Sequence, residues 1–336
     1  MEKSFSLINF TENEIRPHAN EIDANKLVLK GYLRTLVLEI SDSVDLKSEL
    51  PQNSDLESLF GASTALAFVF WQHLAVLERL QGIPEWIQKN PTTWDSLTTG
   101  KKTCGLATTH LAKPGGAGIK GIETENGYLI TGTAPWVCGH EIFDYLLVGF
   151  ETNDAIHFAM IDFPVANPDV EPSTQEMICL NGTATVNLKF KNLLIKNSEW
   201  IQSRKKPIAP QPRKTTFLIP ELGIGKTALL ETKRLIKDSN HPRHILVAKN
   251  ISGLEARLGS IKTLKKDGES LDALVLLRDD FNRDAIRMLA IATGASALNK
   301  NSLAARLQME TFLLDSVIHS PTALAAKISK LGQSNT

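Results

Sequence analysis

The sequence has few cysteines, no excess of either charge and no long apolar run. Its three cysteines, Cys104, Cys138 and Cys179, form an odd count without a C-x-x-C pair, which excludes a complete disulfide framework and a zinc-ligand spacing. Lysine plus arginine and aspartate plus glutamate each number 37, so the formal net charge is zero. This balance predicts binding neither to nucleic acid nor to an anionic membrane.

Targeting signals are also missing. The first residues, MEKSFSLINFTENE, are acidic and lack the apolar stretch of a secretory signal. No apolar run approaches the length of a membrane span. We therefore expect a cytoplasmic protein with no membrane partner and no bound metal.

The sequence does contain an ordinary globular composition, with 42% apolar and 22% charged residues over 336 positions. This length has room for one large domain or two to three small ones. The apolar periodicity changes twice and predicts an α+β protein. We expect an N-terminal helical domain at 1–99, a middle antiparallel β-domain at 100–202, a linker at 203–213 and a C-terminal helical bundle at 214–336.

Helical spacing dominates the first hundred residues. Apolar side chains between Leu27 and Ile40, and again between Ser54 and Leu80, recur with the period of an α-helix. Every residue from Ala65 to Trp71 is apolar, so we expect the second helix to be buried on most faces. The polar pair Gln72-His73 lies in the middle of it, and we interpret His73 as a hydrogen-bonded core or interface residue.

Period-two patterns dominate the middle of the chain. Asn126-Gly127 lies between two β-compatible runs and predicts a hairpin with a type I′ turn, which requires φ > 0 at both central residues. Asn153-Asp154 marks a second hairpin. From Thr183 to Phe190 apolar and polar residues alternate, with Val186, Leu188 and Phe190 on one face, as in a half-buried antiparallel strand.

Beyond the β-region a basic, proline-rich stretch runs from Arg204 to Lys214. We interpret it as a solvated linker, with an anion-binding patch as the alternative. Helical patterns then return, and the apolar residues of 247–261 follow the four-three spacing of a bundle helix. Further helices are predicted from Arg283 to Leu298 and from Leu303 to Ile318.

One stretch resembles a nucleotide-binding P-loop. Gly223-Ile-Gly-Lys-Thr227 matches the end of a Walker A loop, and the apolar run ending in Asp279-Asp280 matches a Walker B strand. The first glycine of the loop is replaced by Pro220, which has no N–H to offer a phosphate. A glycine-containing helix is the competing interpretation, which leaves a P-loop NTPase as a minor alternative.

The stretch from Cys104 to Phe150 resembles the middle β-domain of the acyl-CoA dehydrogenase superfamily. The resemblance is carried by a threonine near its start, the hairpin NGYLITG and the corner PWVCG, and the three-part layout extends it to most of the chain. It implies a barrel-like β-domain and a bound FAD. Thr108, Trp136, Val137 and Cys138 fall on family positions at the isoalloxazine ring. From residue chemistry alone, Trp136 would instead fill the core of the β-domain.

The sequence departs from the family pattern at several positions. Ala134 replaces the usual lysine, Cys138 replaces a hydroxyl residue beside flavin N5, and Thr109-His110 replaces Glu-Pro. The family's catalytic glutamate is missing from the last helical segment, where Glu310 and Asp315 are the weak candidates. The other family position for the base, near Arg213–Thr216, is not acidic, and Arg243 is only a loose match to the arginine that contacts the FAD pyrophosphate.

The resemblance implies an FAD-dependent oxidoreductase that acts on an acyl thioester or a similar small molecule. A monooxygenase or oxidase of the same fold, which needs no α-proton base, is one alternative. A degenerate scaffold without cofactor is another. The family also implies a homodimer or homotetramer formed through the C-terminal bundle, where the 247–261 stripe would supply apolar surface. The sequence determines neither the acyl-chain length of the substrate nor the identity of the electron acceptor.

Overall fold

The structure is a computed structural model that describes residues 6–51, 53–112, 118–163, 167–206, 221–266, 271–317, 325, 328 and 329. Its contacts divide the chain into two compact units. The first comprises Met1–Leu7, Glu21–Pro51 and Ala65–Pro212, and the second comprises Ile8–Asn20, Gln52–Thr64 and Arg213–Thr336. Within the described residues, no helix has the length and apolar character needed to cross a membrane.

The helices of the first unit begin where the sequence offers caps. In α3 (Lys26–Ser43) the Asn25 side chain caps the first turn, since its Oδ1 accepts a hydrogen bond from the backbone N–H of Leu27 at 2.9 Å. Prolines occupy the first turns of α6 (Pro84–Lys89) and α7 (Pro91–Thr98). The long helix α5 (Thr64–Gln81) is buried on most faces, as its apolar run predicts.

Helix α5 is bonded to the edge of the sheet through its two central polar residues. The side-chain oxygen of Gln72 accepts from the backbone N–H of Leu106 at 3.2 Å, and His73 Nδ1 accepts from that of Cys104 at 3.3 Å. His73 is fully buried. The sequence-based interpretation of His73 as a hydrogen-bonded core residue is confirmed.

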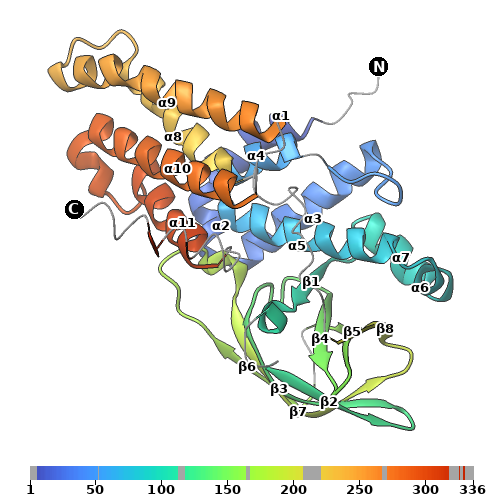
Figure 1. The fold of residues 1–336 in the computed structure, drawn as a ribbon. Helices are drawn as coiled ribbons and strands as arrows, with labels where there is room; N and C mark the ends of the chain where they lie inside the picture. The colour runs from blue at the N-terminus through green and yellow to red at the C-terminus, as the bar shows by residue number, and fades with distance from the viewer. Residues whose placement is uncertain are drawn as a thin grey trace. The chain divides into compact units, whose positions relative to one another are not determined.

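Eight strands in the described part of the chain form one sheet, drawn in green and yellow in Figure 1, with the path β6-β7-β3-β2-β4-β5-β8 and with β1 paired to β4. They are β1 (Cys104–Ala107), β2 (Ile119–Thr124), β3 (Gly127–Val137), β4 (Tyr145–Glu151), β5 (Ala155–Asp162), β6 (Val170–Thr174), β7 (Val186–Lys196) and β8 (Trp200–Lys205). The expected barrel-like closure is not observed, because the sheet is open. Two pairings, β1 with β4 and β2 with β4, are parallel, so the expected antiparallel domain is mixed.

Both predicted hairpins are present, but the first turn is shifted by one residue. Thr124 pairs with Gly127, so Glu125 and Asn126 form the tip, and neither has a positive φ. The type I′ turn at Asn126-Gly127 is therefore wrong. Gly127 is needed for another reason: its φ is +139°, and a Cβ there would lie 1.9 Å from the carbonyl oxygen of Ile195 on β7.

The predicted alternation in β7 is confirmed at Val186, Leu188 and Phe190, which are all buried. The strand begins at Val186 rather than Thr183, because a 3₁₀ turn, η4 (Asn181–Thr183), occupies the preceding residues. A register shift against β3 follows, with Asn192 at a φ of +58°. This bulge resets the alternation so that Leu193 and Ile195 are buried in turn.

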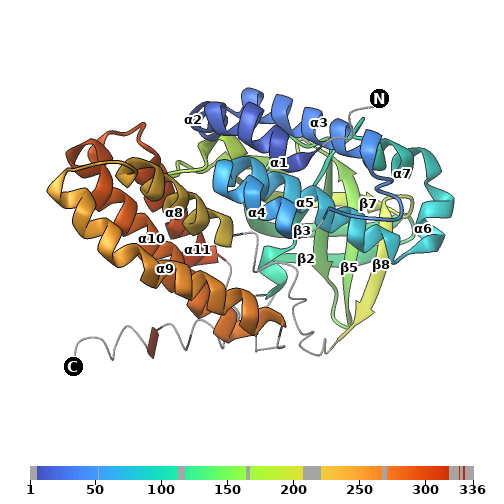
Figure 2. The ribbon, with the colours of Figure 1, turned by 90° about the horizontal axis from the view of Figure 1, so that it is seen from above.

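The second unit is helical. It contains α4 (Asn53–Ala62), α8 (Leu222–Ile236), α9 (Pro242–Lys266), α10 (Leu271–Thr293) and α11 (Leu303–Val317), with α8, α9 and α10 side by side in Figures 1 and 2. The short helix α1 (Leu7–Phe10), the π-helical turn η1 (Thr11–Ile15), the 3₁₀ turn η2 (Arg16–His18) and α2 (Ala19–Ala24) lie at the start of the chain, and the 3₁₀ turn η6 (Gly294–Leu298) follows α10.

The apolar stripe predicted in 247–261 has a definite place in this unit. Leu254 and Ile261 belong to the core between the helices, and Ile251 and Leu258 pack against that core. The prediction of a bundle seam is confirmed. The same burial means that the stripe serves the unit's own core and does not offer its apolar surface to a second copy.

Candidate functional site

The corner at the end of β3 is built around a β-bulge. Ala134 pairs with Leu188 and Val137 with Val186, so Pro135 and Trp136 together oppose the single residue Asn187. Proline tolerates this position because a bulge leaves its missing N–H without a ladder partner. The extra residue turns the Trp136 indole outward.

Trp136 has an unusual backbone and an exposed side chain. Its φ is +58°, its N–H donates to the Asn187 side-chain oxygen at 3.1 Å, and 52% of the residue is exposed. A left-handed conformation costs a tryptophan about 1–3 kcal/mol, and such strain gathers at functional sites. The prediction that Trp136 fills the core is wrong. The side chain presents a large apolar face to the outside of the unit.

A second strained segment fixes the corner from the β7 side. Leu180 and Ala184, on either side of η4, also have positive φ values. The backbone N–H of Gly139 donates to the Thr183 carbonyl at 2.7 Å. The corner and η4 therefore form one hydrogen-bonded piece, with strained residues on both sides of it.

The Cys138 thiol is engaged inside this piece. Cys138 Sγ lies 3.2 Å from Thr185 Oγ1, which lies 2.9 Å from Thr183 Oγ1, and Thr183 donates to the Leu180 carbonyl at 2.7 Å. Because Thr183 donates to a carbonyl, Thr185 donates to Thr183, and the thiol donates to Thr185. Burial raises the pKa of the Cys138 thiol. The thiol is thus neutral, and its proton points into the protein.

Close packing explains the glycine that ends the corner. A Cβ on Gly139 would lie 2.0 Å from the ring of Phe143, and a Cβ on Gly105 in β1 would lie 2.4 Å from the same ring. The phenyl ring therefore fills the space that both glycines leave. This contact holds β1 and the corner at a fixed separation.

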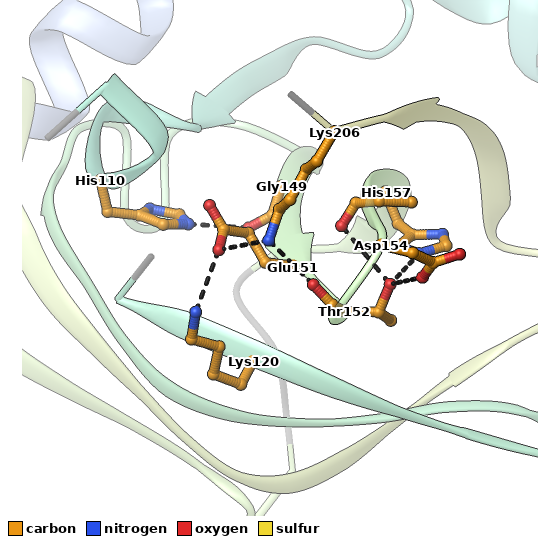
Figure 3. A network of polar contacts seen from close by, with 9 residues as sticks. His110, Lys120, Gly149, Glu151, Thr152, Asp154, His157 and Lys206 are labelled. Carbon is orange, nitrogen blue, oxygen red and sulfur yellow. Dashed lines mark hydrogen bonds and ion pairs between the residues drawn. The ribbon is translucent and has the colours of Figure 1, made fainter. Parts of the chain in front are cut away.

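Thr108 lies apart from the corner, directly after β1. The residue is half-buried, and its carbonyl accepts from the Leu111 N–H at 3.1 Å. Next to it, His110 Nε2 lies 2.8 Å from the Gly149 carbonyl and donates to it (Figure 3). The structure brings Trp136, Val137 and Cys138 together in one segment and places Thr108 at the end of a different strand of the same sheet. Val137 is buried and paired with Val186, so it can offer a ligand its backbone rather than its side chain.

Burial also shapes the chemistry of His73 beneath β1. The buried environment lowers the pKa of His73 from 6.5 to about 4. The imidazole is therefore neutral near pH 7. That state lets its Nδ1 accept the Cys104 N–H.

Figure 3 shows a polar network that the sequence did not predict. The Glu151 carboxylate accepts from Lys206 Nζ at 2.8 Å and from Lys120 Nζ at 3.0 Å, and Lys206 also donates to the Thr152 carbonyl at 2.8 Å. Burial opposes ionisation of Glu151, but the two ammonium groups outweigh it and hold its pKa below the usual 4.5. The first part of the basic stretch is thus bonded to the β4–β5 hairpin and is not freely solvated.

His157 forms the second half of this network. Its Nε2 lies 3.0 Å from Thr152 Oγ1, its Nδ1 lies 2.9 Å from Ser203 Oγ, and Thr152 Oγ1 donates to Asp154 at 2.9 Å. Burial lowers the pKa of His157. The ring also stacks on Phe150, with centroids 5.1 Å apart. These partners are cross-strand or turn neighbours, so the group closes the hairpin. A sequence search for catalytic motifs would miss it, because only strand register brings the residues together.

Of the weak candidates for a catalytic base, Glu310 is engaged by neighbouring side chains. The Glu310 carboxylate is buried and accepts from Arg306 Nη1 at 2.9 Å and from Thr64 Oγ1 at 2.8 Å, all within the second unit. Asp315 lies in α11, but its side chain is outside the described part of the structure. The residues Arg213–Thr216, the other family position for a base, also lie outside the described part of the structure. Arg243 lies beside Gly294, where an added Cβ would contact its guanidinium.

The P-loop interpretation is wrong. Gly223 and Gly225 lie inside α8, where a Cβ would come within 1.7 Å of the Glu57 carbonyl oxygen and 2.4 Å of Asn282 Oδ1 respectively. Lys226 forms an ion pair with Glu57. The expected Walker B strand is the middle of helix α10, where Arg278 forms buried ion pairs with Glu221 and with Asp279, the latter at 2.7 Å. These glycines serve helix packing.

The residues of the corner fit a planar aromatic cofactor better than they fit a metal. Trp136 supplies an exposed ring on a fixed backbone, and Val137 supplies backbone groups next to it. All three cysteines are free and buried. Among the described residues, no group of three or more histidine, cysteine or acidic side chains could hold a metal ion.

No protein-family model and no curated protein matches the sequence, but solved structures do. Butyryl-CoA dehydrogenase from Megasphaera elsdenii superposes with a TM-score of 0.71 at 12% identity, over 98% of this chain and 100% of that one. A glutaryl-CoA dehydrogenase bound to glutaryl-CoA gives a TM-score of 0.74 at 12% identity, over 99% and 97%. KijD3 in complex with dTDP gives 0.72 at 13% identity, over 98% and 95%. The chain has an acyl-CoA dehydrogenase-like fold.

Proposed function

We propose, with this fold as the premise, that the protein is a flavin-dependent oxidoreductase that binds FAD at the Trp136 corner. The observation that carries the proposal is Trp136 itself: an indole that is 52% exposed, held at a φ of +58° by a bulge. An exposed aromatic ring on a strained, well-supported backbone is typical of a ligand contact. A structural neighbour, the glutaryl-CoA dehydrogenase from Mycobacterium smegmatis, was solved with FADH2, which supports a flavin in this fold.

Different residues at and near the corner would contact different parts of the cofactor. Trp136 would stack on the flavin ring, the backbone at Val137 would lie beside it, and Thr108 would contribute from the end of β1. When bound, the flavin supplies two-electron redox chemistry. Cys138 would contribute little as a donor, since its thiol proton is directed to Thr185 and a thiol is a weak donor in any case.

The substrate side of the proposal is an acyl thioester, oxidised between two carbons with a weak or altered activity. The weakness follows from the missing base. A positioned general base contributes about 10²–10⁴-fold to such a reaction. Glu310, the described candidate, already accepts from Arg306 and Thr64 and is buried with them. It serves as an internal ion-pair partner rather than a free proton acceptor.

A flavin-dependent monooxygenase or oxidase is the second candidate. The engagement of Glu310 favours it, because that chemistry requires no base for an α-proton. The neighbour KijD3 is bound to dTDP rather than to an acyl-CoA, so proteins of this fold are not restricted to one ligand class.

The assembly is also part of the proposal. We expect a homodimer or homotetramer that uses the C-terminal helices. Since the 247–261 stripe is buried internally, the apolar surface for a partner copy would come from other residues on α9 and α10, such as Leu246, which is 62% exposed, and Ile291, which is 56% exposed. Closed symmetric assemblies are the common outcome for such surfaces.

The test begins with the visible absorbance spectrum of the purified protein and its uptake of FAD after reconstitution. The proposal predicts a flavin band that stays with the protein through gel filtration. A colourless protein that takes up no FAD would contradict it.

The flavin-loaded protein then separates the two candidates. Slow anaerobic bleaching by saturated acyl-CoAs of several chain lengths supports the altered dehydrogenase. Fast, stoichiometric bleaching would mean that an unassigned base exists. Oxygen uptake after chemical reduction, together with no bleaching by any acyl-CoA, supports the monooxygenase or oxidase.

A further inference from the structure

The ring of Phe158 in β5 is shared by two arginines of the first unit. The guanidinium carbon of Arg79 lies 4.3 Å from the ring centroid, and that of Arg204 lies 5.7 Å from it. The two carbons can therefore be no farther apart than the sum of those distances. Arg79 comes from the last turn of α5 and Arg204 from β8, so two elements bring their positive charges to one place.

Strand register explains why Arg204 reaches this ring. Arg204 pairs with Ile156 across the β5–β8 ladder, and Phe158 is two residues farther along β5. Side chains two residues apart on a strand project from the same face, so Arg204 and Phe158 are diagonal neighbours. His157 and Ser203 point to the opposite face. The arginine pair is thus separate from the network of Figure 3.

Neither arginine has an acidic partner among the residues that the structure describes. Within the described ranges, no hydrogen bond or ion pair reaches the guanidinium of Arg79 or of Arg204, and Arg79 Nη1 is buried without a hydrogen-bond partner. Residues 200–220 contain no aspartate or glutamate. Lys206, two positions after Arg204, is by contrast paired with Glu151. Among the described residues, Arg79 is thus left without the counter-charge that buried cations in proteins normally have, and the exposed Arg204 adds a second positive charge beside it.

The electrostatics of Arg79 agree with this geometry. Burial lowers the pKa of Arg79 from 12.5 to about 10, and the positive charge of Arg204 lowers it further in the same direction. Glu78, the preceding residue on α5, does not offset this, because adjacent helix residues project from different faces. Two like charges are held near each other at an energetic cost that an anion would remove.

We propose that Arg79 and Arg204 bind a phosphate dianion at the Phe158 face of β5. Two unpaired guanidinium groups match a dianion in charge, and each can form two parallel hydrogen bonds to phosphate oxygens. The Phe158 ring is 5% exposed and is covered by the guanidinium groups, so it offers no stacking surface to a base or sugar. The ligand is therefore recognised through its phosphate, either as the free ion or as a phosphate group on a small molecule.

This site goes beyond the proposed flavin chemistry and does not depend on it. It lies on β5, β8 and α5 and uses none of the residues assigned to FAD. It also gives a specific role to one residue of the basic stretch, Arg204, for which the sequence left open a solvated linker or an anion-binding patch.

The test is isothermal titration calorimetry of the full-length protein with inorganic phosphate, pyrophosphate and AMP at physiological ionic strength. We expect saturable binding, weakened by about 10- to 100-fold in Arg204→Gln, because charge-assisted hydrogen bonds are lost. Arg204 is exposed, so this variant keeps its fold. Arg79→Gln should weaken binding as much, and Arg204→Lys should restore only part of it.

Lys205→Gln is the matched control, since Lys205 carries the same charge on the same strand but faces away from Phe158. Its affinity should stay within about threefold of the wild type, because only distant screened charge is removed. Stronger Arg-dependent binding of AMP than of phosphate would identify a nucleotide as the source, and equal binding would identify the free ion. Absence of saturable binding, or equal loss in Lys205→Gln and Arg204→Gln, would overturn the proposal.

Discussion

The corner at Trp136 and the first turn of α8 both carry residues that are typical of a cofactor site. They differ in whether those residues are free to contact a ligand. At the corner, the backbone is strained and the largest side chain is half-exposed. At the start of α8, Gly223 and Gly225 touch neighbouring helices, Lys226 is paired with Glu57, and Glu221 is paired with Arg278. Among the described residues of this turn, the glycines and the lysine that a P-loop would use are therefore engaged in packing and ion pairing.

This difference gives a criterion for judging motifs. A packing motif places its glycines where a neighbour fills the missing Cβ, and it satisfies its charges internally. A binding motif keeps costly features that the fold itself does not need. Three of the four predictions below test whether α8 is only a packing element and whether the corner is strained, and the other tests the buried imidazole of His73 as a further packed polar group.

The largest effect is expected at Arg278. Arg278→Met should destabilise the protein by about 3–5 kcal/mol, because it leaves the carboxylates of Glu221 and Asp279 buried without their cation. Urea denaturation followed by circular dichroism measures this. Arg283→Met on the same helix is the control, since its ion pair with Asp280 is partly exposed and should contribute less than about 1 kcal/mol. Equal effects would show that the α8 end of the bundle is not held by buried charge.

The second effect concerns the buried imidazole beside β1. His73 has a folded pKa of about 4 against 6.5, so between these values the unfolded chain binds more protons than the native one. Stability should therefore be fully present above about pH 6.5 and fall by about 3 kcal/mol as the pH drops to 4. In His73→Asn, whose side-chain oxygen can replace Nδ1, this part of the pH dependence should vanish. A wild-type curve that is flat over that range would contradict a neutral, buried His73.

The third effect separates packed glycines from free ones. Gly223→Ala should cost about 2–3 kcal/mol, because its Cβ would meet the Glu57 carbonyl. Gly253→Ala in α9, where nothing lies within 4 Å, should instead stabilise by about 0.5–1 kcal/mol. Urea midpoints of the two variants test this. If Gly223→Ala is tolerated, the packing account of α8 fails and the glycine needs another explanation.

The smallest effect isolates the strain at the corner. Trp136→Gly and Trp136→Ala both remove the indole, but only alanine keeps the cost of a left-handed backbone, so the glycine variant should be more stable by about 1 kcal/mol. At Ile122, an exposed position in β2 with an ordinary backbone, the order should reverse. Thermal unfolding of the four variants compares them. The same order at both positions would mean that Trp136 is not strained.

Much of the fold followed from local patterns. The helical period at 27–40, the two hairpins and the alternation in β7 are confirmed, because each depends on residues close together in the chain. The period at 54–80 predicted one helix, but the chain forms two there, α4 (Asn53–Ala62) and α5 (Thr64–Gln81), with a break at Ser63. Barrel-like closure is not observed, because the sheet is open, with β6 and β8 at the two ends of its path. The parallel pairing of β1 and β2 with β4 is a long-range choice that alternation does not encode. The three-part division by residue number stays a prediction.

The candidate site was predictable only in part. The family pattern led to Trp136, but residue chemistry alone placed it in the core, because the bulge depends on how β3 registers with β7. The inward direction of the Cys138 thiol depends on hydroxyls nearly fifty residues away. Arg79 and Phe158 carried no motif at all. Their meeting with Arg204 follows from strand register and from the placement of one helix end.

The central claim, that the Trp136 corner binds FAD, is tested most directly by titrating FAD into the wild type, Trp136→Ala and Trp200→Ala while following flavin fluorescence. Trp200 is the matched control, since it is also a partly exposed tryptophan on a strand of the same sheet. We expect Trp136→Ala to bind FAD about tenfold more weakly, because one aromatic stacking contact is lost, and Trp200→Ala to bind like the wild type. Equal affinities for wild type and Trp136→Ala, or a loss confined to Trp200→Ala, would contradict the account.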